Sequence, residues 1–118
     1  ESIAYVVRAN VEQITAVTGQ PPAALFVGGG MSSNPLLVGL IADTLGVPLH
    51  RALEPQSTGL GCAMLGAVGA GAYPDLVSAT RAMCRHETVS PDEGRRAMRD
   101  AGFRTWRDLY DRLQGLSI

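Results

Sequence analysis

Lysine is absent from this sequence, whose ten basic residues are all arginines. A phosphate-binding P-loop requires a lysine, so that class of nucleotide site is excluded. The formal net charge of −1 lacks the basic excess of a nucleic-acid surface, so we expect no nucleic-acid partner. No apolar run reaches the roughly 18 residues of a membrane span, because the longest, residues 60–72, is short and rich in glycine. We therefore expect no membrane partner either.

Cysteine and histidine are nearly absent too. Cys62 and Cys84 are the only cysteines, with no CxxC pair and no flanking histidine, so we expect no metal site. Lone cysteines are typical of a reducing compartment, which predicts a cytoplasmic protein. His50 and His86 have no companion nucleophile or ligand set, and we assign neither a catalytic role.

The length of 118 residues predicts one modest domain, and a hydrophobic content of 46% is ordinary for a folded chain. The sequence starts at Glu1 rather than at methionine, and it opens directly in a helical pattern. We therefore expect a piece of a longer protein.

The first half of the chain shows alternating helix and strand patterns. Apolar residues at spacings of three and four predict a helix over residues 3–17, which Gly19 ends. The continuous apolar run 23–27 predicts a strand covered on both faces. Asn34 and Pro35 mark the start of a second helix that ends at Gly46. Residues 47–51 alternate between apolar and polar, which predicts a second strand.

The second half is predicted to be helical. Ser57 or Thr58 is expected to cap a helix through about Ala72, whose glycines would let it pack closely on a neighbour. Residues 74–85 form the next predicted helix. Residues 90–93, Ser-Pro-Asp-Glu, read as a capping box that starts a last helix running towards residue 113. One side of this last helix should be apolar, with Met98, Trp106, Leu109, Tyr110 and Leu113.

The predicted order is helix, strand, helix, strand and then three helices. Alternation of this kind indicates an α/β fold with a parallel sheet. Two strands alone make a poor sheet. We therefore expect an incomplete sheet, which either a missing part of the domain or a partner completes. An exposed strand edge could also pair between copies, which keeps a homodimer as an alternative.

The stretch LFVGGGMSSNPLL, residues 25–37, is the main candidate for a functional site. The first amides of a helix have no partner within it, and glycines allow a ligand close to the backbone. An anionic or polar ligand such as a nucleotide fits that geometry. A tight turn with no ligand fits it as well, whereas a dinucleotide fold does not, because GxGxxG is missing.

Residues 27–73, VGGGMSSNPLLVGLIADTLGVPLHRALEPQSTGLGCAMLGAVGAGAY, resemble the C-terminal domain of the FGGY carbohydrate kinases. The resemblance rests on the glycines 28–30, the Ala-Asp-x-x-Gly of 42–46, the Val-Pro of 47–48, Glu54 and the small residues 59–63. It extends over about residues 1–86, and more loosely over the tail.

The resemblance implies a kinase that moves the γ-phosphoryl group of ATP, with Mg²⁺, onto a sugar or polyol hydroxyl. It also implies a ribonuclease-H-like, actin-like ATPase fold, with residues 1–118 as the nucleotide-side C-terminal domain. By position, the family's nucleotide contacts fall on Gly28, Gly29, Gly30, Met31 and Ser33. Ser33 faces adenine in this transfer, and the adjacent Asn34 contributes while its main role is to cap the following helix.

The same resemblance places the catalytic base, the sugar pocket and the phosphate loops before this stretch. We therefore assign no catalytic residue and no metal ligand within residues 1–118, and expect no turnover by this chain alone. Its expected partners are the N-terminal kinase domain of the same parent chain and a sugar or polyol. Asp43 is predicted to be a surface or helix-packing residue and Glu54 a structural loop residue. The alternative from another class is a non-catalytic binding or assembly module with a structural glycine turn.

Overall fold

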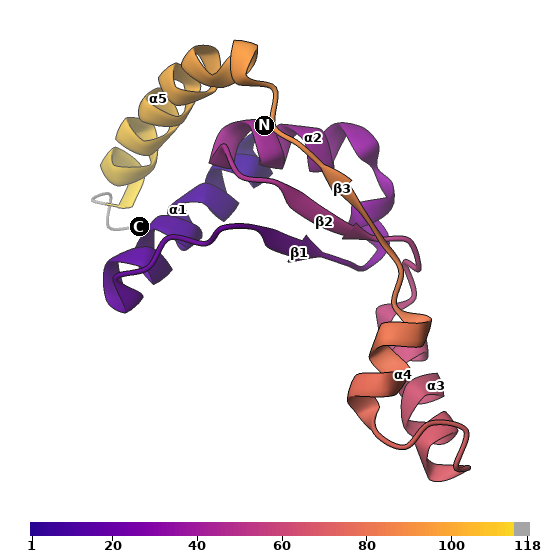
Figure 1. Ribbon diagram of the computed structural model, residues 1–118. Helices are drawn as coiled ribbons and strands as arrows, with labels where there is room; N and C mark the ends of the chain where they lie inside the picture. Colours follow the sequence, from indigo (N-terminus) through magenta and orange to yellow (C-terminus); the bar gives the residue numbers. More distant parts are fainter. Residues whose placement is uncertain (115–118) are drawn as a thin grey trace.

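The structure is a computed structural model that describes residues 1–114. Within these residues, five helices, three strands and two short 3-10 helices follow one another (Figure 1). In order they are α1 Ser2–Thr18, β1 Leu25–Val27, η1 Gly30–Ser33, α2 Pro35–Leu45, β2 Leu49–Ala52, α3 Ser57–Gly69, α4 Leu76–Met83, β3 His86–Val89, η2 Glu93–Arg95 and α5 Arg96–Gln114.

The sheet has the strand order β1-β2-β3. β1 and β2 are parallel with Val27 opposite Arg51, and β3 is antiparallel to β2 with Glu87 opposite Arg51. The mixed α/β class and the parallel pair are as predicted. The third strand is not, because a helix was predicted to end near Arg85 and no strand was predicted at residues 86–89. This segment is mostly exposed and lacks an apolar pattern, so only its pairing with β2 defines it.

The core lies between one face of the sheet and the helices α1 and α2 (Figure 1). Its buried members are Ala4, Val38, Ile41, Ala42 and Leu49. The other face of the sheet is open among the described residues, where the side chain of Phe26 is 75% exposed. The prediction that residues 23–27 form a strand covered on both faces is therefore wrong for this chain.

Local end signals of the first two helices are confirmed. α1 ends at Gly19, which has a left-handed φ of 72°. Asn34 caps α2, and Gly46 ends that helix with a φ of 69°. These residues act through their own backbone geometry, which is why the sequence reveals them.

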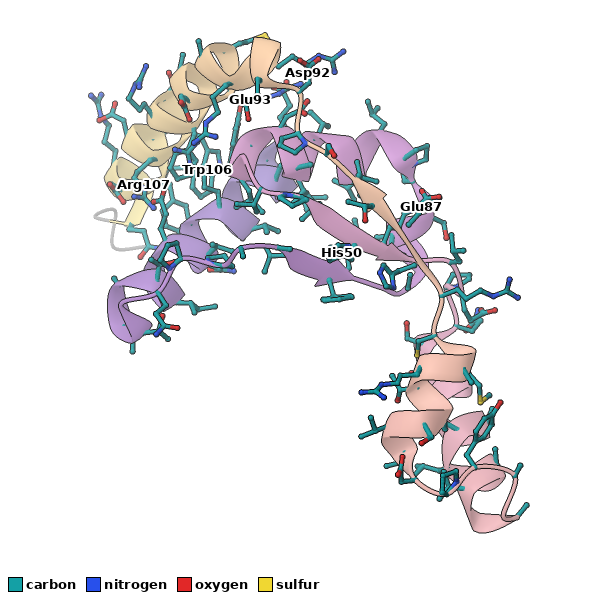
Figure 2. All side chains as sticks on the ribbon, viewed as in Figure 1. His50, Glu87, Asp92, Glu93, Trp106 and Arg107 are labelled. Carbon is teal, nitrogen blue, oxygen red and sulfur yellow. The ribbon has the colours of Figure 1, made fainter. Side chains whose placement is uncertain are left out.

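The helix α5 packs across α1 and α2 through charged and aromatic side chains (Figure 2). The guanidinium of Arg8 lies 4.2 Å from the ring centre of Phe103 and donates to Asp100 and to the Thr44 carbonyl. On the side of this helix that was predicted to be apolar, Trp106 packs against Tyr5 of α1, with ring centres 6.1 Å apart. The prediction is wrong for the other members, Met98, Leu109, Tyr110 and Leu113, which are exposed. The arginines serve as packing groups as well as solvated charges.

The start of α5 also differs from the prediction. Asp92, not Ser90, is the cap: its Oδ1 accepts from the Gly94 amide at 3.0 Å and opens η2, which leads into α5. Asp43, buried on α2, in turn accepts from the Asp92 amide at 2.7 Å. This contact between distant segments fixes the cap, and no local pattern encodes it.

The helices α3 and α4 form a hairpin that projects away from the sheet (Figure 1). No residue of α3 is buried, and its N-cap Gln56 makes no side-chain cap bond, so the predicted caps Ser57 and Thr58 are wrong. The Cα positions of Gly61 and Gly66 have no neighbour within 4 Å of an added Cβ. The expected close packing is therefore missing among the described residues. The radius of gyration of 17.7 Å exceeds the roughly 13.5 Å of a compact domain of this length.

The docking of α5 predicts a pH dependence of stability. The hydrogen bond from Arg8 holds the pKa of Asp100 below its ordinary value against the opposing effect of burial, and the charges of Arg96 and Arg104 act in the same direction. The ionised form therefore favours folding. This stabilisation is present above the carboxyl pKa of the unfolded chain, about 4, and is lost as the pH falls through the lower folded value.

We expect Asp100→Asn to lower the free energy of unfolding at pH 7, and this deficit to shrink towards pH 2.5. Urea unfolding at the two pH values measures it. Asp108→Asn, which removes an exposed ion pair with Arg112, is the matched control and should have a small effect at both. An equal deficit for Asp100→Asn at both pH values would contradict the assigned ionisation.

Candidate functional site

The candidate site is the backbone segment between β1 and α2. After Gly28, the chain turns at Gly29, which has a φ of 89° and a ψ of 175°. Residues 30–33 then form η1 before α2 begins. A glycine-rich turn between the strand and a helix that starts at Asn34 and Pro35 was predicted from the sequence, and its 3-10 conformation was not.

The carbonyl of Gly29 is held within this loop. It accepts two hydrogen bonds from the buried Ser32, from the amide at 3.0 Å and from Oγ at 2.7 Å. The amides of Gly29, Gly30 and Met31 donate to no group within residues 1–114. The loop therefore presents three amides that are available to a ligand.

Asn34 takes up the first amides of α2. Its Oδ1 accepts from the amides of Leu36 at 3.0 Å and Leu37 at 3.3 Å. The capping role that the sequence predicted is confirmed. The expectation of bare amides at the helix start is corrected, because the unpaired amides lie one turn earlier, at Gly29 to Met31.

Arg51 is a contact of the loop that the sequence analysis missed. Its Nη1 donates to the Ser32 carbonyl at 3.3 Å, and its Nη2 lies 2.6 Å from Oε1 of Glu87. In the sequence, Arg51 stands out only as a charged residue at an alternating position of the predicted strand that also contains Leu49. Its partner Glu87 lies on the unpredicted strand β3, so the contact could not be anticipated.

Two hollows meet at Gly28. One, of about 180 Å³, lies towards α1 and α2 and is lined by Ile3, Val27, Gly28, Met31, Ser32, Leu37, Val38 and Ile41. The other, of about 210 Å³, lies on the open face of the sheet and includes Cys84, Arg85 and His86. Of the predicted site residues, Gly28 and Met31 line these hollows. Ser33 and Asn34 are exposed and border neither.

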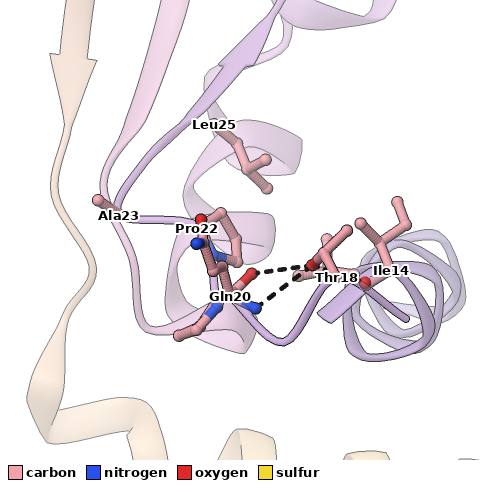
Figure 3. Close-up of a pocket in the computed structure, with 8 residues that line it drawn as sticks. Ile14, Thr18, Gln20, Pro22, Ala23 and Leu25 are labelled. Carbon is pink, nitrogen blue, oxygen red and sulfur yellow. Dashed lines mark hydrogen bonds between the residues drawn. The ribbon is translucent and has the colours of Figure 1, made fainter. Parts of the chain in front are cut away.

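A larger hollow, of about 550 Å³, lies at the opposite end of β1 (Figure 3). It is lined mainly by apolar side chains, including Val11, Ile14 and Leu25, together with the turn in which Thr18 Oγ1 contacts Gln20. No ionisable side chain lines it. Although this hollow is larger than the two at Gly28, it offers no charged side chain that could bind a charged ligand.

Other polar residues have structural roles in the described part of the chain. Asp43 is buried and holds the Asp92 amide, which confirms the helix-packing alternative. Glu54 accepts from the Gln56 amide at 2.8 Å within its own loop. On the open sheet face, the ring of His50 lies 4.8 Å from the Phe26 ring in a tilted arrangement and 5.1 Å from the His86 ring in an edge-to-face one.

Two further findings concern residues 1–114. No three His, Cys, Asp or Glu side chains gather there in a way that could hold a metal ion. No helix in this part is both long and apolar enough to cross a membrane.

Comparison with known proteins identifies the family. A model of the C-terminal domain of the FGGY family of carbohydrate kinases matches residues 1–70. The chain belongs to this family. The matched region contains α1, β1, the glycine loop, α2, β2 and α3, so it includes the entire candidate site.

Curated relatives agree with the family. The autoinducer-2 kinases of Escherichia coli K12 and Klebsiella pneumoniae are each 29% identical over 117 residues, which cover 98% of this chain and 22% of the relative. The chain thus spans about a fifth of the length of the relatives it matches.

Solved structures agree as well. A xylulose kinase from Rhodospirillum rubrum has a TM-score of 0.72 at 26% identity, covering 95% of this chain and 23% of that protein. A xyloylose kinase from Brucella ovis has a TM-score of 0.76, covering 98% of this chain and 24% of that protein. Because its sequence identity is 23%, this likeness supports the fold alone. The predicted actin-like α/β fold class and the family resemblance are confirmed.

The loop geometry predicts different costs for two neighbouring glycines. Gly29→Ala places a Cβ at a φ of 89°, which costs about 1–3 kcal/mol. Gly30→Ala is the matched control, because its added Cβ has no neighbour within 4 Å and its φ is not positive. We expect the first variant to unfold at lower urea and the second to match or exceed the unsubstituted chain. Equal midpoints for the two variants would contradict the described loop.

Proposed function

We propose that residues 1–118 are the nucleotide-side C-terminal domain of a longer kinase that transfers the γ-phosphoryl group of ATP to a sugar or polyol hydroxyl. The observation that carries the proposal is the trio of unpaired amides at Gly29, Gly30 and Met31 in a chain of the FGGY family. Unpaired backbone amides provide hydrogen-bond donors to the polar parts of a nucleotide.

Gly28 and Gly29 provide the close backbone contact in this proposal. Gly28 lies between the two hollows, and Gly30 has open space where a side chain would otherwise stand. Met31 offers an apolar, 59% exposed side chain as the wall against a base.

Ser33 and Asn34 supply the polar contacts on the adenine side. Both are exposed, and the Asn34 Oδ1 is already engaged in the helix cap. Only the Asn34 NH₂ group is therefore free to donate to the base. The proposed adenine contact of Asn34 is thus a donor contact, towards a ring nitrogen.

Phosphoryl transfer also needs Mg²⁺ and a base that accepts the proton of the sugar hydroxyl. We place both in the part of the kinase that precedes this chain, together with the sugar pocket. This chain then binds and orients ATP but performs no turnover by itself. The cytoplasm, where ATP is abundant and lone cysteines stay reduced, is the location that fits this proposal.

The partner that we propose for this chain is the N-terminal domain of the same kinase. α3 has 13 residues without a charge, and none of them is buried in the described part of the chain. Leu65 on this helix is 59% exposed, and Val77 on α4 is 60% exposed. Exposed apolar surface of this kind marks a site of contact with other protein. The relatives are more than four times as long as this chain, so they contain additional protein that could cover it.

Substitution of Gly30 tests the proposed nucleotide contact. Because an added side chain meets no protein atom within 4 Å, Gly30→Leu should fold normally and obstruct the approach of ATP to the loop. In the full-length kinase we expect a rise in the KM for ATP of about tenfold, equivalent to about 1.4 kcal/mol, with an unchanged KM for the sugar.

Gly39→Leu is the matched control for that experiment. Gly39 lies within α2, and an added Cβ there also has no neighbour within 4 Å. It should leave both KM values near those of the unsubstituted enzyme. If Gly30→Leu left the KM for ATP unchanged, the loop would be a structural turn and the chain a non-catalytic module or a domain with its nucleotide elsewhere.

A further inference from the structure

Arg51 connects the glycine loop to the sheet. It lies in the middle strand, opposite Val27 on β1 and Glu87 on β3. Its Nη1 donates to the Ser32 carbonyl, while its Nη2 pairs with the Glu87 carboxylate. One planar guanidinium therefore joins η1 to β2 and β3. We propose that Arg51, oriented by Glu87, is a positioning residue that holds the loop in its nucleotide-binding shape.

The carbonyl of Gly29 has a fixed direction. In a trans peptide the C=O and the next N–H point in opposite directions. Because Ser32 binds the Gly29 carbonyl oxygen from two atoms, the amide of Gly30 is directed the opposite way, out of the loop. The position of Ser32 thus determines the direction of a proposed ATP contact.

Ser32 is itself held in position by Arg51. Ser32 is buried, and its own carbonyl accepts the hydrogen bond from Arg51 at 3.3 Å. No other side chain within residues 1–114 donates to that carbonyl. Loss of Arg51 would leave a buried acceptor unpaired, and the 3-10 turn would rearrange to hydrate it.

Glu87 in turn orients Arg51. Its Oε1 lies 2.6 Å from Nη2 of Arg51, whose side chain is 21% exposed. The carboxylate neutralises the guanidinium close to the loop, so Arg51 acts on ATP through loop shape rather than as a free positive charge. Lysine at this position keeps the charge but lacks the planar fork that reaches both partners.

The inference rests on the proposed function and is tested in the full-length kinase. For both Arg51→Met and Arg51→Lys we expect a rise in the KM for ATP of about three- to tenfold, with the KM for the sugar unchanged. Arg112→Met is the matched control, since it removes an ion pair of 2.9 Å on α5 without contact to the loop. It should leave both KM values unchanged.

Hydrogen exchange without nucleotide gives a readout besides activity. Peptides that contain residues 28–33 should exchange faster in Arg51→Met than in the unsubstituted enzyme and in Arg112→Met. Ser32→Ala, which removes the Oγ bond to the Gly29 carbonyl, should raise exchange and the KM for ATP in the same direction. This variant carries the test if Arg51→Met fails to fold.

The outcomes separate the inference from the proposed function. An unsubstituted enzyme that does not phosphorylate a sugar with ATP contradicts the proposed function. An active enzyme in which Arg51→Lys keeps its KM for ATP overturns the positioning role, and charge alone then explains Arg51. Equal rises in the KM for ATP and for the sugar also overturn it, because they indicate a general structural defect.

Discussion

The carbonyl of Gly29 accepts two hydrogen bonds from Ser32, and the geometry of the candidate site depends on this pair. Peptide planarity converts the fixed carbonyl into a fixed, outward amide at Gly30. Because Gly29 has no Cβ, it adopts the positive φ that this turn requires without a steric penalty. Neither feature requires a ligand, so the loop is organised in advance for the nucleotide that we propose it binds, and such preorganisation lowers the entropy cost of binding.

The rest of the chain supplies support for this loop on one side only. α1 and α2 bury one face of the sheet, and α5 fastens them through Arg8 and Phe103. The opposite face and the uncharged helix α3 have no cover in the described residues. These uncovered surfaces support the proposal that the chain is one domain of a longer kinase, and the relatives are about four to five times its length.

The sequence predicted the parts of the fold that depend on local chemistry. Gly19, Asn34 and Gly46 set helix ends through their own backbone or side-chain geometry, and the structure confirms them. β3 was missed because its residues gain their strand conformation only from pairing with β2. The cap of the last helix was assigned to Ser90 instead of Asp92, since the bond between the Asp92 amide and Asp43 joins residues 49 positions apart.

The same division holds for the candidate site. The glycines and Asn34 were visible in the sequence, but Ser32 and Arg51 were not, because their roles depend on which carbonyls the folded loop turns inward. The nucleotide contacts themselves stay predictions.

The most direct measurement is a crystal structure of the full-length kinase with a non-hydrolysable ATP analogue. We predict that a polar atom of the nucleotide lies within hydrogen-bonding distance, about 3 Å, of at least one amide among Gly29, Gly30 and Met31. A fully occupied nucleotide bound away from this loop would contradict the account.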